Sequence, residues 1–167
     1  RVVKTRNALY DALVALILRQ DYESITVQTI LAEADVGRST FYAHFTSKDD
    51  LLASSLDRLG DLLRQATASD ADGQSWSLVL FSHVAEYKDV YFALAGAEAS
   101  NVLQGAIRSV VTDFVRATVP PAEGIPAELA CSHVAGTFMT VIAWWLDRKR
   151  TLQPAEVDRL FLRLLTV

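Results

Sequence analysis

Apolar residues recur at a helical spacing along almost the whole chain. Near the N-terminus, Leu9, Leu13, Leu16 and Ile17 fall on one face of a helix. The β-branched residues follow the same spacing, and no Asn-Gly or Asp-Gly turn joins two alternating runs, so no segment favours a strand. The pattern predicts an all-α fold of about nine helices.

The stretch from Thr26 to Phe45 predicts two short helices joined by a tight turn. Thr26 is a typical N-cap, and the inward positions of the first helix are apolar. Asp35 follows where the turn needs a left-handed conformation, which aspartate tolerates, and Gly37 gives the backbone further freedom before the second helix. Two helices joined this closely cross at roughly 90–120°.

The second of these helices combines inward aromatic residues with polar ones. Phe41 and Phe45 face inward because they lie one helical turn apart. The side chains left at its start and on its outer faces are those of Arg38, Ser39, Thr40, Tyr42 and His44. Ser47 and Asp50 then match a capping box at the start of a long amphipathic helix. The second helix therefore suits packing on one side and a polar ligand on the other.

A polar stretch at residues 68–73 interrupts the helical pattern and is the best candidate for a domain boundary within the chain. Beyond it, helices are predicted at residues 76–87, 101–118, 126 to about 150, and from 154 onward, with a short break near Tyr87. Pro120 ends one helix, whereas Pro126 and Pro154 open others, because proline suits a first turn.

The helix after Pro126 is apolar on two adjacent faces and carries small residues, Gly136, Thr140 and Ala143, on a third. A helix that is apolar nearly all round must be buried nearly all round. A second copy of the chain provides such burial, and symmetric dimers are the commonest oligomers, so we expect a homodimer. The alternative is a central helix in a monomeric bundle.

Composition limits the classes of function. The 167 residues are 51% hydrophobic, which suffices for one or two compact domains. With a net charge of −4, any contact with nucleic acid depends on a local basic patch. The single cysteine, Cys131, excludes an internal disulfide and a cysteine-based zinc site, and no apolar run has transmembrane length. We expect a soluble cytoplasmic protein with no cofactor, no metal and no membrane partner.

A local basic region does surround the second short helix. No acid occurs from Val36 to Lys48, and the N-terminal segment adds Arg1, Lys4 and Arg6 as a basic arm. A helix that enters the major groove of DNA needs short side chains for close approach and longer donors for bases and phosphates. The candidates for base contacts are Arg38, Ser39 and Thr40, and those for phosphate contacts are Tyr42, His44 and Lys48.

The same stretch resembles the N-terminal signature of the TetR family of bacterial transcriptional regulators. The matching positions are Thr26–Val27, Ile30, Ala34, Val36, Arg38–Tyr42, His44–Phe45 and Lys48–Leu51. The resemblance implies a helix-turn-helix DNA-binding domain at residues 1–47 and a ligand-binding and dimerisation domain at residues 48–167. It also implies a homodimer through the last two helices, a pseudo-palindromic operator in double-stranded DNA, and a phosphate near Thr26 and Val27.

Two positions depart from the family pattern. Asp35 stands where the family usually has glycine, and Gly37 stands where a serine-like cap is usual. A carboxylate near DNA is mildly unfavourable, and glycine is the weaker cap by roughly a few tenths of a kcal/mol. Neither change argues against the fold.

Family members usually sense a small molecule in the C-terminal domain, so the resemblance implies a repressor that a ligand releases from DNA. The candidate lining residues are Tyr87, Tyr91, Phe92, Phe114, His133, Thr137, Thr140 and Trp144. An apolar pocket with a few polar groups is the usual form of a ligand site. There are two alternatives: the aromatic residues are plain core, or the core is filled and a protein partner controls the regulator.

Catalysis is disfavoured. The three histidines, His44, His83 and His133, fall in separate segments, and no carboxylate pair or nucleophile motif accompanies them. Cys131 and His133 are two residues apart and point to different sides of a helix. We therefore expect a regulator and not an enzyme.

Overall fold

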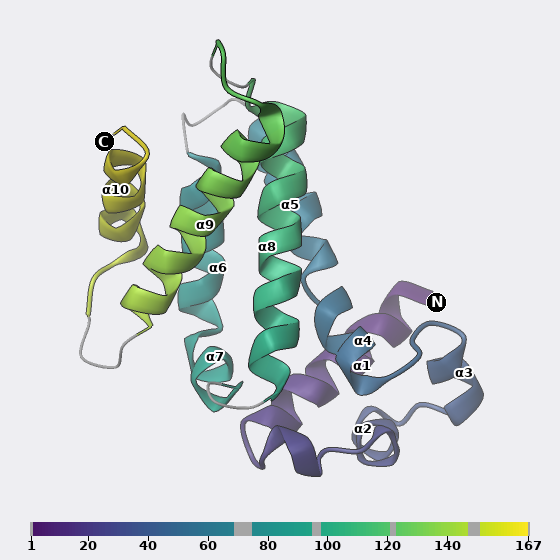
Figure 1. Cartoon of the computed structure of the whole chain (residues 1–167). Coiled ribbons are helices and arrows are strands. Elements are labelled where there is room, and N and C mark those ends of the chain that lie inside the picture. The colour runs from purple at the N-terminus through teal and green to yellow at the C-terminus, as the bar shows by residue number, and fades with distance from the viewer. Residues whose placement is uncertain (1, 69–74, 95–97, 121–122, 147–150, 167) are drawn as a thin grey trace. The chain divides into compact units, whose positions relative to one another are not determined.

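The computed structural model describes residues 2–68, 75–94, 98–120, 123–146 and 151–166 (Figure 1). Within these ranges the chain forms ten α-helices, one short 3₁₀ helix and no strand. The expected all-α fold is confirmed. The extra helix arises because the helix expected after Ser47 is two helices.

In chain order the elements are α1 (Val2–Ile17), the 3₁₀ helix η1 (Tyr22–Ser24), α2 (Val27–Ala34), α3 (Arg38–Tyr42), α4 (Lys48–Ser54), α5 (Asp57–Ala68), α6 (Trp76–Glu86), α7 (Lys88–Leu94), α8 (Glu98–Thr118), α9 (Ala127–Trp145) and α10 (Pro154–Leu164). They form two compact units, Arg1–Leu56 with Asp89–Leu103, and Asp57–Lys88 with Gln104–Val167. The domains expected at residues 1–47 and 48–167 stay a prediction. Residues 69–73 of the polar stretch expected to mark a domain boundary lie outside the described residues.

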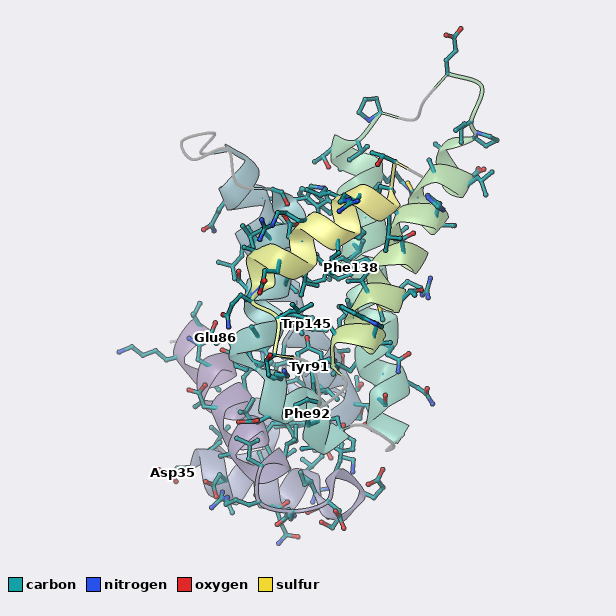
Figure 2. The ribbon with its side chains drawn as sticks, turned by 90° about the vertical axis from the view of Figure 1, so that its left-hand side faces the viewer. Asp35, Glu86, Tyr91, Phe92, Phe138 and Trp145 are labelled. Carbon is teal, nitrogen blue, oxygen red and sulfur yellow. The ribbon has the colours of Figure 1, made fainter. Side chains whose placement is uncertain are left out.

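The two ends of α2 follow the prediction. The Thr26 hydroxyl accepts a hydrogen bond from the Thr29 amide (3.1 Å), and the Thr26 amide donates to the Thr29 hydroxyl (3.0 Å). These reciprocal bonds cap the first turn of the helix. At the other end Asp35 adopts the left-handed conformation, with φ 51° and ψ 48°, and lies at the outside of the first unit (Figure 2). The helix-turn-helix turn therefore forms as expected, on a non-glycine residue.

Gly37 does not use the backbone freedom of glycine. Its φ of −71° and ψ of 150° are extended values that any residue adopts, so the expected need for glycine freedom was wrong. It is the N-cap of α3, and no side chain caps the helix there. The helix that it caps, α3, is short and ends at Tyr42.

The start of α4 differs from the expected capping box in one bond. The Ser47 hydroxyl accepts from the Asp50 amide as predicted (3.0 Å). The Asp50 carboxylate, however, accepts from the amide and hydroxyl of Thr46 (2.8 and 3.1 Å), one residue before the cap. The aspartate therefore fixes the chain that enters the helix.

The long helix expected after Ser47 is interrupted between α4 and α5. The Ser55 hydroxyl donates to the Leu52 carbonyl, and the Leu56 amide donates to the Ala53 carbonyl, three residues back (3.1 Å). Serine side chains compete for helix carbonyls, and bonds three residues back tighten the turn. Periodicity alone does not detect this break, because Leu52, Leu56, Leu59 and Leu63 are all buried.

Aromatic rings fill the second unit, where α10 packs against α6 and α9 (Figure 1). Phe81 lies at its centre, with ring centroids 4.7 Å from Phe138, 5.8 Å from Phe161 and 5.9 Å from Trp145. Phe138 and Trp145 point from α9 into the unit (Figure 2). Edge and tilted contacts of this kind add to the free energy of burial.

One buried carboxylate joins α10 to the start of α6. Asp158 accepts hydrogen bonds from the hydroxyls of Ser75 (2.9 Å) and Ser77. Ser77 and Asp158 are the buried polar side chains of the described core, with exposed fractions of 0% and 6%. Ser75 also caps α6 by accepting from the Leu78 amide (3.2 Å). The carboxylate thus lies beside the positive end of the helix dipole.

The remaining helix ends correct the prediction in detail. The break at Tyr87 and the start of α10 at Pro154 are confirmed, whereas α8 begins at Glu98, three residues early. Pro126 precedes α9 as its N-cap, and α9 ends at Trp145 rather than near residue 150. The Trp145 indole donates to the carbonyl of Leu152 (3.0 Å), which fixes the chain after the helix. No helix in the described ranges is long and apolar enough to span a membrane.

Candidate nucleic-acid interface

Two buried phenylalanines, one on α3 and one just after it, attach this segment to the first unit. Phe41 is 0% exposed and Phe45 is 2% exposed, with ring centroids 5.7 Å apart. On the other side of α3 the candidate base-contacting residues, Arg38, Ser39 and Thr40, are all exposed. The structure therefore has the division between inward aromatic and outward polar residues that the sequence predicts.

Arg38 and Tyr42 lie together on the exposed side of α3. The Arg38 Cζ atom is 5.6 Å from the centre of the Tyr42 ring, within range of a cation–π contact. The Tyr42 ring itself packs edge-on against Phe41, with centroids 5.2 Å apart. Tyr42 therefore links the Arg38 guanidinium to the buried core.

The expected N-terminal basic arm is helical. The helix α1 begins at Val2 and contains no glycine or proline, and Arg1 lies outside the described residues. Lys4 is exposed, but Arg6 is half-buried: its guanidinium donates to the Tyr10 hydroxyl (3.3 Å) and lies 5.5 Å from the Phe45 ring centre. Lys4 is thus available to a ligand, whereas Arg6 packs partly against its own domain.

Three other predicted contacts surround α3 and the start of α2. Thr26 is exposed, while Val27 and His44 are half-buried. The Thr26 hydroxyl and amide are both engaged with Thr29. The His44 ring centroid is 6.2 Å from that of Phe45. The start of α2 therefore offers backbone amides rather than a free Thr26 hydroxyl.

Lys48 is expected to hold a phosphate, but in the structure its ammonium group makes most of its hydrogen bonds within the chain. Its ammonium donates to the carbonyls of Tyr22 (2.7 Å) and Ile25 (3.0 Å). It also lies 4.3 Å from the centre of the Tyr22 ring. The two bonds use two of the three N–H groups of the lysine, so one remains for any phosphate.

Tyr22 and Asp49 complete this arrangement, and the sequence interpretation missed both. The Tyr22 hydroxyl donates to the Asp49 carboxylate at 2.5 Å, while the Tyr22 ring is buried. Burial, together with the bond to Asp49, raises the pKa of the Tyr22 phenol, which stays a neutral donor. The only sequence signal was an aromatic residue four positions before the Thr26 cap.

The four predicted ligand-lining residues of α9 do not lie in the interior of the second unit. His133, Thr140 and Trp144 are exposed and Thr137 is half-buried, whereas the opposite side of α9 is buried. Thr137 donates to the carbonyl of His133, and Thr140 to that of Gly136, both at 2.9 Å. Their role in binding a ligand stays a prediction.

The other four predicted lining residues are divided between the units. Phe114 is buried core, 5.5 Å from the Trp76 ring, and Tyr87 is partly exposed in the second unit. Tyr91 and Phe92 lie on α7 (Figure 2), in the part of it that belongs to the first unit. The Tyr91 hydroxyl is buried and has no hydrogen-bond partner in the described structure, and burial raises its pKa. Of the eight, Tyr91 alone has a buried polar atom without a hydrogen-bond partner in the described structure.

Comparison with known families matches residues 9–54 to the family of bacterial regulatory proteins named tetR. An alignment of 178 positions covers 100% of this chain and shows 24% identity to an uncharacterised HTH-type transcriptional regulator, YxbF, of Bacillus subtilis (strain 168). The alignment covers 46% of YxbF, so the chain spans about half the length of this relative.

Solved structures share the fold over nearly the full chain. A TetR transcriptional regulator from Streptococcus agalactiae 2603V is 23% identical, with a TM-score of 0.63 over 98% of this chain and 94% of that one. A protein from Syntrophomonas wolfei str. Goettingen, described as a TetR-family transcriptional regulator, is 14% identical, with a TM-score of 0.70 over 99% and 95%. At these identities the likeness concerns the fold.

Proposed function

We propose that the chain, whose residues 9–54 match the tetR family of bacterial regulatory proteins, is a DNA-binding transcriptional regulator of that family and acts as a repressor. It binds a pseudo-palindromic operator as a homodimer in the cytoplasm, and a small molecule releases it from the DNA.

The polar side of α3 carries this proposal. It presents Arg38, Ser39 and Thr40 to solvent without an acidic neighbour from Val36 to Lys48, on a helix attached by buried phenylalanines. Short hydroxyl side chains permit close approach to base edges, and an arginine reaches a guanine or a phosphate. Tyr42, 48% exposed, extends from the same side and holds a phosphate.

The remaining predicted contacts position the protein on the duplex. Lys4, the third N–H of Lys48 and the backbone amides at Val27 reach phosphates, with His44 and Arg6 at the edge of this surface. Such contacts set register and orientation without reading sequence. They also make binding dependent on salt, because each phosphate contact releases condensed cations.

Dimerisation is supported by apolar side chains that one chain leaves exposed on α9 and α10. Leu129 is 62% exposed and Leu164 is 48% exposed. A methyl group added at Gly136 of α9 meets nothing within 4 Å in the single chain, which leaves room for a partner helix. Two heads held in a dimer then read half-sites about 34–36 Å apart.

A matched pair of glycines tests the dimer. Gly136→Leu should shift the protein to monomer in sedimentation velocity, because the larger side chain blocks a close helix. Gly105→Leu, on α8, also enters open space and should leave the dimer unchanged. Equal behaviour of the two variants would place the interface elsewhere.

The effector contacts Tyr91. A buried hydroxyl without a partner is costly, and a ligand atom that accepts its hydrogen bond removes this cost. Because the phenol stays neutral, the effector brings an acceptor on an otherwise apolar body. Its binding favours a conformation with low operator affinity, through a coupling on the order of 1–3 kcal/mol.

Control by a protein partner is the second candidate. The observation that favours it is the filled aromatic core around Phe81, together with the exposed position of His133 and Trp144. In that case no small molecule raises the melting temperature of the isolated protein. A ligand screen by thermal shift, repeated with Tyr91→Phe, separates the two candidates.

Fluorescence anisotropy with a duplex selected in vitro from a random pool tests DNA binding. Tyr42→Ala and Arg38→Ala should weaken binding at least about tenfold, as expected for loss of groups at the contact. Tyr87→Ala and Arg116→Ala are controls, because both residues are exposed in the second unit. Failure to select any sequence, or equal losses in the controls, would contradict the proposal.

A further inference from the structure

We propose that Tyr22 and Asp49 are positioning residues of the DNA interface, which together with Lys48 form a clasp between the start of α2 and the start of α4. This inference rests on the proposed operator binding. The two residues act through Lys48 and the backbone before α2, and they need not touch DNA.

The clasp joins two segments that are far apart in the sequence. From α4, Lys48 donates to the carbonyls of Tyr22 and Ile25, at 2.7 and 3.0 Å. From η1, Tyr22 donates its hydroxyl back to Asp49 at 2.5 Å. The two segments therefore hold each other through bonds in both directions, and the ammonium lies 4.3 Å from the ring between them.

The bonded segment leads directly into the DNA-facing part of the unit. Ile25 is 1% exposed and is followed by Thr26, the N-cap of α2. A shift of the segment from Tyr22 to Ile25 therefore moves the first turn of α2. The same shift moves Lys48, whose remaining N–H group is the one available to a phosphate.

The burial of the participants shows why each is needed. Tyr22 is 4% exposed, so its hydroxyl requires a partner, and Asp49 is the one it has. Asp49 itself is exposed, at the first turn of α4. An exposed carboxylate close to bound DNA repels phosphate and so weakens DNA binding. An aspartate at this position therefore needs a compensating role in the protein. Here Asp49 holds Tyr22 in place through its hydroxyl, and the Tyr22 carbonyl in turn accepts a hydrogen bond from Lys48.

This reasoning predicts the sign of a charge-removing substitution. Asp49→Asn should weaken operator binding on the order of three- to tenfold, although it removes a negative charge, because the neutral amide oxygen accepts the Tyr22 hydrogen bond more weakly than the carboxylate does. Asp35→Asn is the matched control: Asp35 is also exposed and acidic, lies in the same unit, and asparagine keeps its left-handed turn. It should tighten binding, as electrostatics alone predicts.

A double-mutant cycle tests whether Tyr22 affects DNA affinity through Lys48. Tyr22→Phe keeps the ring and removes only the hydroxyl, and it should weaken binding by a similar factor in the wild-type background. In Lys48→Met the same substitution should change the affinity less than about twofold, because coupled residues are not additive. The slope of log Kd against log salt should fall in Tyr22→Phe toward that of Lys48→Met, which loses about 0.9 per phosphate contact.

The experiment uses the full chain and the duplex selected above, with folding checked by circular dichroism. If Tyr22→Phe does not fold, Asp49→Asn carries the test, because its side chain is exposed. Tighter binding by Asp49→Asn, additive effects of Tyr22→Phe and Lys48→Met, or an unchanged salt slope would overturn the clasp alone. Absence of any selected duplex for the wild-type protein would overturn the proposed function, and the clasp with it.

Discussion

Serine in place of Gly37 should stabilise the start of α3. Gly37 is the N-cap of this helix, with extended backbone angles and no capping side chain. A Cβ atom added there meets only the Thr40 hydroxyl oxygen, at 3.9 Å, an ordinary contact. A serine therefore fits without strain, and its hydroxyl accepts a hydrogen bond from the amide of Ser39 or Thr40.

Two contributions set the size of the effect. Serine is the better cap by roughly 0.3 kcal/mol, and loss of glycine freedom in the unfolded chain adds roughly 0.4–1 kcal/mol. The free energy of unfolding should therefore rise by about 1 kcal/mol, which shifts a melting midpoint by roughly 2–4 °C for a chain of this length. Gly37→Ala shares the second contribution but is a poor cap, so serine should exceed alanine by about 1 kcal/mol.

Urea unfolding followed by far-UV circular dichroism measures the difference between Gly37→Ser and Gly37→Ala. Emission from the tryptophans is an internal control, because Trp76, Trp144 and Trp145 all belong to the second unit. If the units unfold separately, the substitutions leave the emission midpoint unchanged. Equal stability of the two variants would refute the capping argument, whatever their stability relative to glycine.

Three further predictions concern other positions. Asp35→Gly should raise the free energy of unfolding of the first unit by roughly 0.5–1 kcal/mol in urea, because glycine adopts the left-handed turn without a Cβ clash. An unchanged free energy of unfolding would show that the aspartate is unstrained. Ser77→Ala should cost about 1–3 kcal/mol, because Asp158 loses a buried donor, whereas Ser82→Ala, exposed on the same helix, should cost less than about 0.5 kcal/mol. Burial lowers the pKa of His83 below its ordinary value of 6.5, so the unfolded chain binds the proton first as pH falls. The stability from neutral His83 is present above about pH 6.5 and is lost below it; His83→Gln should flatten that part of the profile, and an unchanged profile would contradict the assignment.

The parts of the fold that the sequence predicted well are those set by neighbouring residues. Thr26 caps α2 because its hydroxyl reaches an amide three residues ahead, and Pro154 begins α10 because its fixed φ suits a first turn. The left-handed Asp35 follows equally from the tight turn between two short helices. Such features depend on a few successive side chains, so the pattern alone identifies them.

Contacts between distant segments were not predictable in the same way. Nothing in the spacing of Tyr22 and Asp49 brings them together, and Lys48 reads as a free basic residue until its two carbonyl partners are known. Asp158 likewise has the appearance of a solvated residue on an amphipathic helix, yet it is buried beside two serines. The position of such groups depends on how helices pack, which composition and period do not determine.

The outer side of α9 illustrates why residue types alone do not tell a pocket lining from a protein interface. Histidine, threonine and tryptophan at helical spacing suit a pocket lining. The same residue types also suit an interface between two chains, because each combines an apolar part with a polar group. The choice depends on which side of α9 the rest of the chain covers, and Phe138 and Trp145 occupy that side. Thr140 and Trp144 are therefore left on the surface, beside the gap at Gly136. If the chain dimerises there, these side chains become buried against the second copy, and an effector within one chain has to be sought around Tyr91 instead.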